Sequence, residues 1–215
     1  MFLIYQIIVS LILILSPFIL IFRILKNKED KNRFIEKFAV PTKKRGNGNL
    51  IWFHGASVGE LQSIVPLLKK YEKKKSIHQI LITSSTLSSS KIIKKFNFKK
   101  TIHQFYPIDH IYFTNKFLNY WKPNVAIFIE SEIWPYMFKR INDKKIPLFL
   151  LNARLTKKTI NRWIKIKSFS KKVFDKISIA YPQNLETKLY LKRIGFKKIK
   201  SLGNLKFAEN TEDKL

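Results

Sequence analysis

From Leu50 onward, short apolar runs alternate with segments in which apolar residues recur at helical spacing. The runs are almost uninterrupted, which is typical of strands buried on both faces of a parallel sheet. Six strands are predicted, over 50–53, 79–82, 102–106, 125–129, 148–151 and 177–180. Helical patterns separate and follow them, near 61–71, 89–96, 114–120, 135–142, 157–174 and 184–194. This alternation predicts an α/β domain with a Rossmann-like parallel sheet and helices on both faces.

Residues 2–25, which precede this domain, are almost wholly apolar and carry no charge before Arg23. Such a stretch is long enough to cross a bilayer. A cleaved signal peptide has positive charge before its apolar run, whereas here the positive charges follow it, so an uncleaved anchor is predicted. The positive-inside rule then places the rest of the chain in the cytoplasm. A spanning helix is favoured, and because Pro17 can kink it, a helix lying in the membrane interface is the alternative.

Polar clusters follow five of the predicted strands, each at the strand's carboxyl end. Open α/β sheets bind ligands at this edge, so the clusters are candidates for one shared site. They occupy residues 55–60, 83–86, 107–109, 130–132 and 152–154.

Glu60 lies in the first cluster, where an apolar run breaks at two glycines and a helical spacing begins. A glutamate in the first turn of a helix lies near the positive end of the helix dipole, and the glycines let another molecule approach the backbone. This arrangement suits a general base, with Ser57 and Gly59 as candidate substrate-binding residues. From spacing alone the favoured interpretation is a capping box, in which Ser57 and Glu60 satisfy the free N–H groups of the helix.

Glu130 and Glu132 stand two residues apart after an apolar strand, in a chain with only 14 acidic residues. A sugar hydroxyl, an amine or an arginine is a suitable partner for them. The alternative is that one of them caps the helix at Pro135 or pairs with Arg154. Arg154 itself suits two-pronged binding of phosphate or carboxylate.

Thr83 and Ser84 supply hydroxyls and backbone donors at a helix entry, which suits phosphate or sugar hydroxyls, although helix capping explains the run equally well. His54 and His103 are individually weak candidates, because a histidine beside a strand end is more often packed than catalytic.

The composition of the chain limits the kinds of ligand that are expected. The net charge of +28 indicates an anionic partner such as nucleic acid, an acidic membrane surface or a phosphorylated lipid, although an A/T-rich genome also accounts for part of it. There is no cysteine, and the four histidines form no metal-binding pattern, so no metal is predicted. Nucleic-acid binding rests only on charge and on the interleaving of lysine and aromatic residues, without a recognised motif, and is not expected.

With these clusters in view, the chain resembles the N-terminal half of the Kdo transferases, which attach 3-deoxy-D-manno-octulosonic acid (Kdo) to the lipid A precursor. The resemblance covers nearly all of residues 50–207. The matching motifs, in order, are WFHGASVGE from Trp52, TSST from Thr83, FYPID from Phe105, ESEIWP from Glu130, NARL from Asn152 and GNLKF from Gly203.

The resemblance implies the N-terminal half of a two-domain GT-B enzyme without a metal or other cofactor. CMP-Kdo is the donor, and the acceptor is the lipid A precursor at an inner membrane rich in acidic lipids. Glu60 matches the family's general base, which takes the proton from an acceptor hydroxyl. Glu130 and Glu132 would shape the acceptor side, and Arg154 would lie near the cleft. Where the family's threonine-rich loop continues with proline and glycine, this chain has Leu87 and Ser88.

On this basis residues 1–26 form a membrane anchor, 27–49 a basic juxtamembrane segment and linker, and 50–207 the acceptor-binding domain. Residues 208–215 are expected to begin the crossing to a donor-binding half that is absent from this chain. The expected function is Kdo transfer with a separate C-terminal half. The alternative is a non-catalytic, membrane-anchored module that binds acidic lipids or organises partners, as a decayed or split transferase half would.

Overall fold

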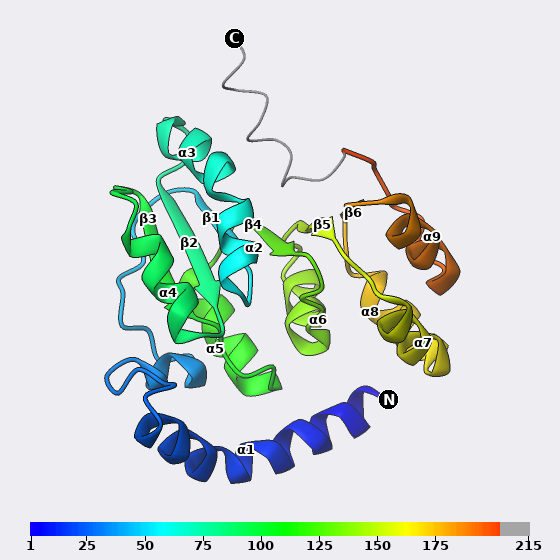
Figure 1. Cartoon of the computed structure of the whole chain (residues 1–215), viewed down its shortest axis with the longest axis horizontal. Coiled ribbons are helices and arrows are strands. Elements are labelled where there is room, and N and C mark those ends of the chain that lie inside the picture. Colours follow the sequence, from blue (N-terminus) through cyan, green and yellow to red (C-terminus); the bar gives the residue numbers. More distant parts are fainter. Residues whose placement is uncertain (203–215) are drawn as a thin grey trace.

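A computed structural model describes residues 1–202 and contains one parallel sheet of six strands in the order β3-β2-β1-β4-β5-β6 (Figure 1). The predicted crossing at 203–207 and residues 208–215 lie outside the described residues. The strands are β1 (Leu50–His54), β2 (Gln79–Ser84), β3 (Thr101–Phe105), β4 (Val125–Ile129), β5 (Leu148–Ala153) and β6 (Ile179–Pro182). The Rossmann-like parallel sheet predicted from the sequence is therefore confirmed.

The apolar runs become strands because alternate side chains enter two separate hydrophobic layers. Along β1, Leu50 and Trp52 enter one layer, and Ile51 and Phe53 enter the other. All five residues of β1 are buried, as a strand between two helical layers requires.

The first layer is covered by α5 (Ile111–Trp121), α6 (Pro135–Asp143), α7 (Lys157–Lys165), α8 (Lys167–Phe174) and α9 (Leu185–Ile194). The second is covered by α2 (Val58–Ser63), α3 (Val65–Lys73) and α4 (Leu87–Lys94). Helices from the two halves of the sheet thus lie on opposite faces, as predicted.

Two helices predicted as continuous are each broken. The segment predicted as 61–71 divides at Ile64 into α2 and α3, because Pro66 occupies the first turn of α3 and has no N–H to continue a preceding helix. The segment predicted as 157–174 divides at Ile166, whose φ and ψ of −118° and 42° are not helical. The Ser170 hydroxyl stabilises this break by donating to the carbonyl oxygens of Trp163 and Ile166.

Helix α1 (Phe2–Leu25) lies lengthwise beneath the domain (Figure 1), and among residues 1–202 it is the one helix long and apolar enough to cross a membrane. Near its start, Tyr5 donates to Asp109 at 2.7 Å, and Gln6 lies 2.6 Å from His110. Near its end, Arg23 contacts Glu29 at 3.1 Å.

The contacts of Tyr5 and Gln6 join the start of α1 to the domain, whereas Arg23 and Glu29 are only six residues apart in the chain. The contacts at the start fit the interfacial alternative, and the spanning arrangement stays a prediction. Apolar side chains are exposed along the whole of α1, among them Leu3, Ile4, Ile7, Leu11, Ile14, Leu15, Phe18, Ile21 and Phe22, and a membrane would cover them in either arrangement.

The segment predicted as a juxtamembrane linker packs against the domain through a 3₁₀ helix, η1 (Phe34–Phe38). Its Glu36 is fully buried and accepts both Arg33 nitrogens at 2.9 Å and the backbone N–H of Phe105 at 2.6 Å. Arg33 also donates to the carbonyl of His103 at 2.8 Å. The segment is therefore attached to β3 by buried charged hydrogen bonds.

Replacing Glu36 with Ala should lower the free energy of unfolding by about 3 kcal/mol, because it leaves Arg33 and the Phe105 N–H without their acceptor. Urea denaturation followed by circular dichroism measures the change. Asp175→Ala, at an exposed position just after α8, is the matched control and should change stability by less than about 0.5 kcal/mol. A loss no larger than the control's would contradict the account of this segment.

Candidate active site at the switch point of the sheet

The strand order reverses between β1 and β4, which are hydrogen-bonded neighbours with their crossovers on opposite faces. Ligands of open α/β sheets bind outside the carboxyl ends of the strands at this point. Glu60 follows β1, and Glu130 and Glu132 follow β4. The topology therefore brings the two acidic clusters of the sequence to one place.

The Glu60 side chain is held at the start of α2 by the loop that follows β1. Its carboxylate accepts the Ala56 backbone N–H at 2.7 Å and the Ser57 hydroxyl at 3.1 Å, while the Ser57 oxygen accepts the Glu60 N–H at 3.3 Å. Gly55 packs closely here, because a Cβ at this position would lie 3.2 Å from the Glu60 Cβ and would push it aside by a few tenths of an ångström. The capping interaction is thus present and holds the same carboxylate that was predicted to be a base.

Glu60 is only 9% exposed. Burial, followed by the negative charge of Glu132, raises the pKa of Glu60 from 4.5 to about 7. The hydrogen bonds from Ala56 and Ser57 act in the opposite direction, and Glu130 adds a smaller upward effect. Near neutral pH this carboxyl group can exchange a proton, which is the property that a general base requires.

Glu132 is kept charged by two donors. His54 Nε2 lies 3.1 Å and Trp134 Nε1 2.9 Å from the same carboxylate oxygen. Burial alone raises the pKa of Glu132, but these hydrogen bonds and the interaction with His54 outweigh it and hold the pKa below its ordinary value. The two neighbouring carboxyl groups are therefore driven apart in pKa, a pattern typical of acid–base sites.

A buried chain of hydrogen bonds orients His54. Trp52 Nε1 donates to Thr83 Oγ1 at 2.8 Å, and His54 Nδ1 lies 3.0 Å from that oxygen and 3.2 Å from the Thr83 carbonyl oxygen. The imidazole ring is thus held by Thr83 on one side and by Glu132 on the other. From the sequence alone His54 is a weak candidate for the site. The feature that could have pointed to it is its position at the end of a strand next to the strand that Glu132 follows.

Glu130 lies beside Arg154, with 3.9 Å between Glu130 Oε2 and Arg154 Nη1. Glu130 and Asn152 both adopt left-handed backbone conformations, with φ of 54° and 52°. Such conformations are costly for residues other than glycine and tend to occur at functional sites. Arg154 is 55% exposed, so its guanidinium is open to solvent at the edge of the site.

Thr83 and Ser84 are not at the surface. Both are fully buried, and the Ser84 hydroxyl lies 2.8 Å from His103 Nε2. The expectation that their side chains grip a substrate does not fit these positions. The cap of α4 is Thr86, whose Oγ1 accepts the Ser89 N–H at 3.2 Å. Ser57 and Gly59 are exposed at the mouth of the site, as their predicted role requires.

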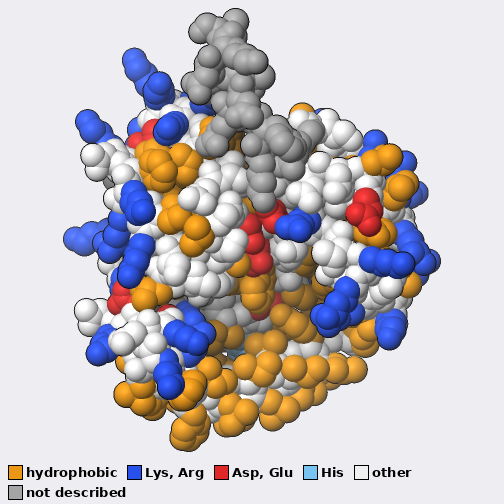
Figure 2. Space-filling model, in the orientation of Figure 1, with side chains coloured by type: hydrophobic (Ala, Val, Ile, Leu, Met, Phe, Trp, Pro, Cys, Tyr) orange, Lys and Arg blue, Asp and Glu red, His pale blue; other side chains and the backbone are white. Residues whose placement is uncertain are grey.

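The molecular surface also shows acidic side chains grouped at this edge of the sheet. Figure 2 shows acidic side chains in the hollowed centre of this face, hydrophobic ones below them, and the hydrophobic band of α1 along the lower edge. Among residues 1–202, no group of three or more histidine, cysteine or acidic side chains is arranged to hold a metal ion.

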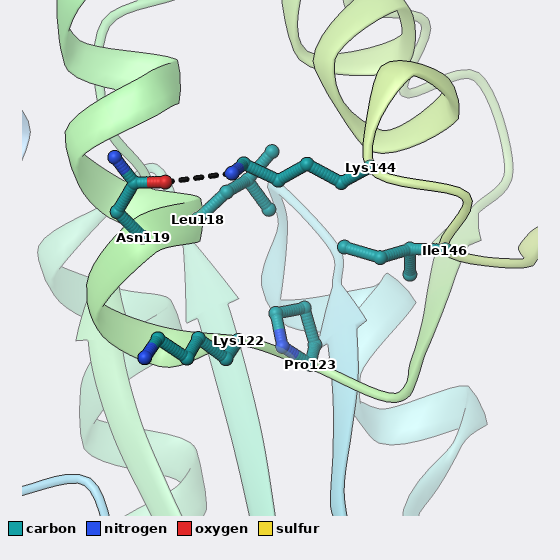
Figure 3. A pocket seen from close by; sticks show the side chains of 6 residues that line it. All are labelled: Leu118, Asn119, Lys122, Pro123, Lys144 and Ile146. Atoms are coloured by element: carbon teal, nitrogen blue, oxygen red, sulfur yellow. Dashed lines mark hydrogen bonds between the residues drawn. The ribbon is translucent and has the colours of Figure 1, made fainter.

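A cavity of about 380 Å³ lies at the opposite end of the sheet and is separate from the carboxylates (Figure 3). It is bounded by the end of α5 and the loop before β5, and Lys144 there donates to Asn119 at 2.6 Å. Pro123 and Ile146, which also line it, immediately precede β4 and β5, so this cavity faces the amino ends of the strands.

Comparison with solved structures agrees with the GT-B-like fold. UDP-N-acetylglucosamine 2-epimerase from Rickettsia bellii matches with a TM-score of 0.53 and 13% identity, over 76% of this chain and 48% of that one. The Neisseria meningitidis enzyme matches with a TM-score of 0.51 and 14% identity, over 74% and 47%. At these identities the likeness concerns the fold alone.

Sequence comparison is more specific. The family model described as 3-deoxy-D-manno-octulosonic-acid transferase (kdotransferase) matches residues 32–209. The 3-deoxy-D-manno-octulosonic acid transferase of Rickettsia bellii is 38% identical over 93% of this chain and 48% of the relative. That of Haemophilus influenzae is 30% identical over 96% of this chain and 50% of the relative. The chain spans about half the length of these relatives, and it belongs to the Kdo transferase family.

Proposed function

We propose that this chain supplies the acceptor-binding half of an enzyme that transfers Kdo from CMP-Kdo to the lipid A precursor. The observation that carries the proposal is the Glu60 carboxyl, which lies at the switch point with a pKa raised to about 7 and beside the charged Glu132. The family match supports the reaction class. Donor binding is assigned to a C-terminal half, because the relatives are about twice as long as the matched region.

In this mechanism Glu60 accepts the proton of an acceptor hydroxyl as that oxygen attacks the anomeric carbon of Kdo. The bond from that carbon to CMP breaks, and CMP leaves with the bonding electron pair. Glu132 stays ionised through its contacts with His54 and Trp134, so its charge keeps the proton affinity of Glu60 high. Metal and cofactor chemistry is not invoked, in line with the prediction from the sequence.

Arg154 and the backbone around Gly59 are proposed to contact the polar part of the acceptor, because both are exposed beside the carboxylates. The acceptor half would work at the cytoplasmic face of the inner membrane. The apolar outer face of α1 and the net charge of +28 support attachment to an acidic bilayer surface.

The function is tested by fusing this chain to the C-terminal half of the Rickettsia bellii relative and measuring Kdo transfer from CMP-Kdo to the lipid A precursor. Glu60→Gln should lower kcat about 10² to 10⁴-fold, the usual contribution of general-base catalysis. Glu186→Gln, a matched change at an exposed site on α9, should leave the rate unchanged. An undiminished rate for Glu60→Gln would remove the general-base role, and a fusion with no activity would favour the non-catalytic alternative.

The same fusion should show a pH dependence set by Glu60. A base must be deprotonated, so kcat/KM should rise as the pH increases through about 7 and then level off. Glu132→Gln removes a negative charge that raises the Glu60 pKa, so the rise should move to lower pH. The pH profile of kcat/KM measures the shift, and a rise that stays in place or moves to higher pH would contradict the proposed coupling.

The orientation of α1 is tested with a cysteine at Leu3, since the chain has no other cysteine. If α1 lies in the interface on the cytoplasmic side, a membrane-impermeant maleimide should label Leu3→Cys only after the cells are opened. A cysteine at the exposed Lys75, which lies in the loop after α3, is the cytoplasmic control. Labelling of Leu3→Cys in intact cells would support the spanning arrangement instead.

A further inference from the structure

A second cavity, of about 380 Å³, lies between α1 and the edge of the sheet that carries the carboxylates. One wall is formed by α1, and the other by the segments that follow β2 and β3 and precede α6. The lining residues are Tyr5, Ile8, Val9, Ile12, Lys37, Ser85, Tyr106, Pro107, Ile108, Asp109 and Trp134.

This cavity is mostly apolar. The Asp109 carboxylate already has partners within the protein. It accepts the Tyr5 hydroxyl at 2.7 Å and the backbone N–H groups of Tyr136 and Met137 at 3.0 and 2.7 Å. Lys37, the cation in the lining, is paired with Glu29. What the cavity offers an occupant is therefore chiefly hydrocarbon contact from side chains such as Ile12.

The outer wall of the cavity belongs to the helix that presents its apolar face to the surroundings. Ile8 and Ile12 line the cavity and are still 51% and 52% exposed, so the lining is continuous with the apolar outer face of α1. Figure 2 shows the same continuity, with hydrophobic side chains extending from the band of α1 into the hollow below the acidic ones. A chain leaving a bilayer beside α1 therefore meets apolar surface throughout.

The inner wall is shared with the candidate active site. Trp134 lines the cavity with its ring and donates its N–H to Glu132 at 2.9 Å. Tyr106 lines the cavity and stacks on His54 with 3.9 Å between ring centroids. The Tyr106 hydroxyl is buried and has no hydrogen-bond partner among residues 1–202, so a polar group of an occupant is a suitable partner for it.

We propose that this cavity binds one acyl chain of the acceptor lipid, with the polar sugar lying over the carboxylates. The inference rests on the proposed function for the identity of that lipid. The new element is that α1 forms part of the substrate-binding site in addition to contacting the membrane. A lipid held in this way reaches Glu60 without leaving the bilayer surface completely.

Photolabelling tests this inference on the 215-residue chain without any sugar transfer. The probe is an acylated glucosamine disaccharide phosphate carrying a diazirine in one acyl chain, presented in phosphatidylglycerol vesicles. Label should be found on residues 106–108 and Trp134, which lie behind α1 as seen from its exposed face. Phosphatidylglycerol carrying the same diazirine should label these positions more weakly, because its headgroup lacks the sugar.

Two matched variants on α1 make the test specific. Ile12→Trp fills the cavity and should lower labelling of 106–108 roughly tenfold, the loss expected when about two methylenes find no room. Ile14→Trp makes the same change on the exposed face and should leave labelling unchanged. Ile8→Trp repeats the test at a second lining residue, and circular dichroism establishes that each variant folds.

Label confined to the outer face of α1, or equal labelling in Ile12→Trp and Ile14→Trp, would overturn the acyl-chain site. Stronger labelling by phosphatidylglycerol than by the sugar lipid would overturn its assignment to the acceptor. These outcomes are separable from the proposed function. Normal transfer with label only on the outer face removes this inference alone, and label at 106–108 in a fusion without activity removes the enzymatic proposal alone.

Discussion

The burial of Glu60 next to the ionised Glu132 is the constraint on which the candidate site depends. It arises because β1 and β4 are parallel neighbours, so the residues that follow them meet at one edge of the sheet. Burial raises the pKa of Glu60, and the negative charge of Glu132, which His54 and Trp134 keep ionised, raises it further. The buried hydrogen-bond network that holds His54 therefore influences the pKa of Glu60, although it does not contact Glu60.

The same edge of the sheet also holds α1. The buried contact between Tyr5 and Asp109 fixes the start of that helix beside α6, and it closes a cavity that an open edge would lack. The Asp109 carboxylate accepts hydrogen bonds both from the N–H groups at the start of α6 and from the hydroxyl of Tyr5. The apolar helix α1 and the candidate site are thus connected through one carboxylate, which a helix that projects away from the domain could not achieve.

Much of this arrangement follows from the sequence by simple rules. Continuous apolar runs between helical patterns predict a parallel sheet, and parallel strands bring Glu60, Glu130 and Glu132 to a common edge. The capping box and the base did not have to be alternatives, because the Glu60 carboxylate that accepts hydrogen bonds from Ala56 and Ser57 still has a raised pKa.

The errors have physical causes. The predicted second strand ended at Ile82, whereas β2 continues through Thr83 and Ser84. Side chains that continue a strand point into the layers above and below the sheet, so these hydroxyls meet Trp52 and His103 and are withdrawn from the surface. The contacts between α1 and the domain could not be predicted either, because a run of apolar residues gives the length of a helix but not the partners of its few polar side chains.

The central claim is that Glu60 is a base adjusted to neutral pH by burial and by Glu132. The most direct measurement is a titration of the Glu60 carboxyl itself, by NMR of the chain carrying ¹³C-labelled glutamate, with Glu60→Gln to assign the signal. The account predicts a midpoint near pH 7. A midpoint at or below the ordinary value of 4.5 would contradict it, because Glu60 would then be a capping residue with no special affinity for a proton.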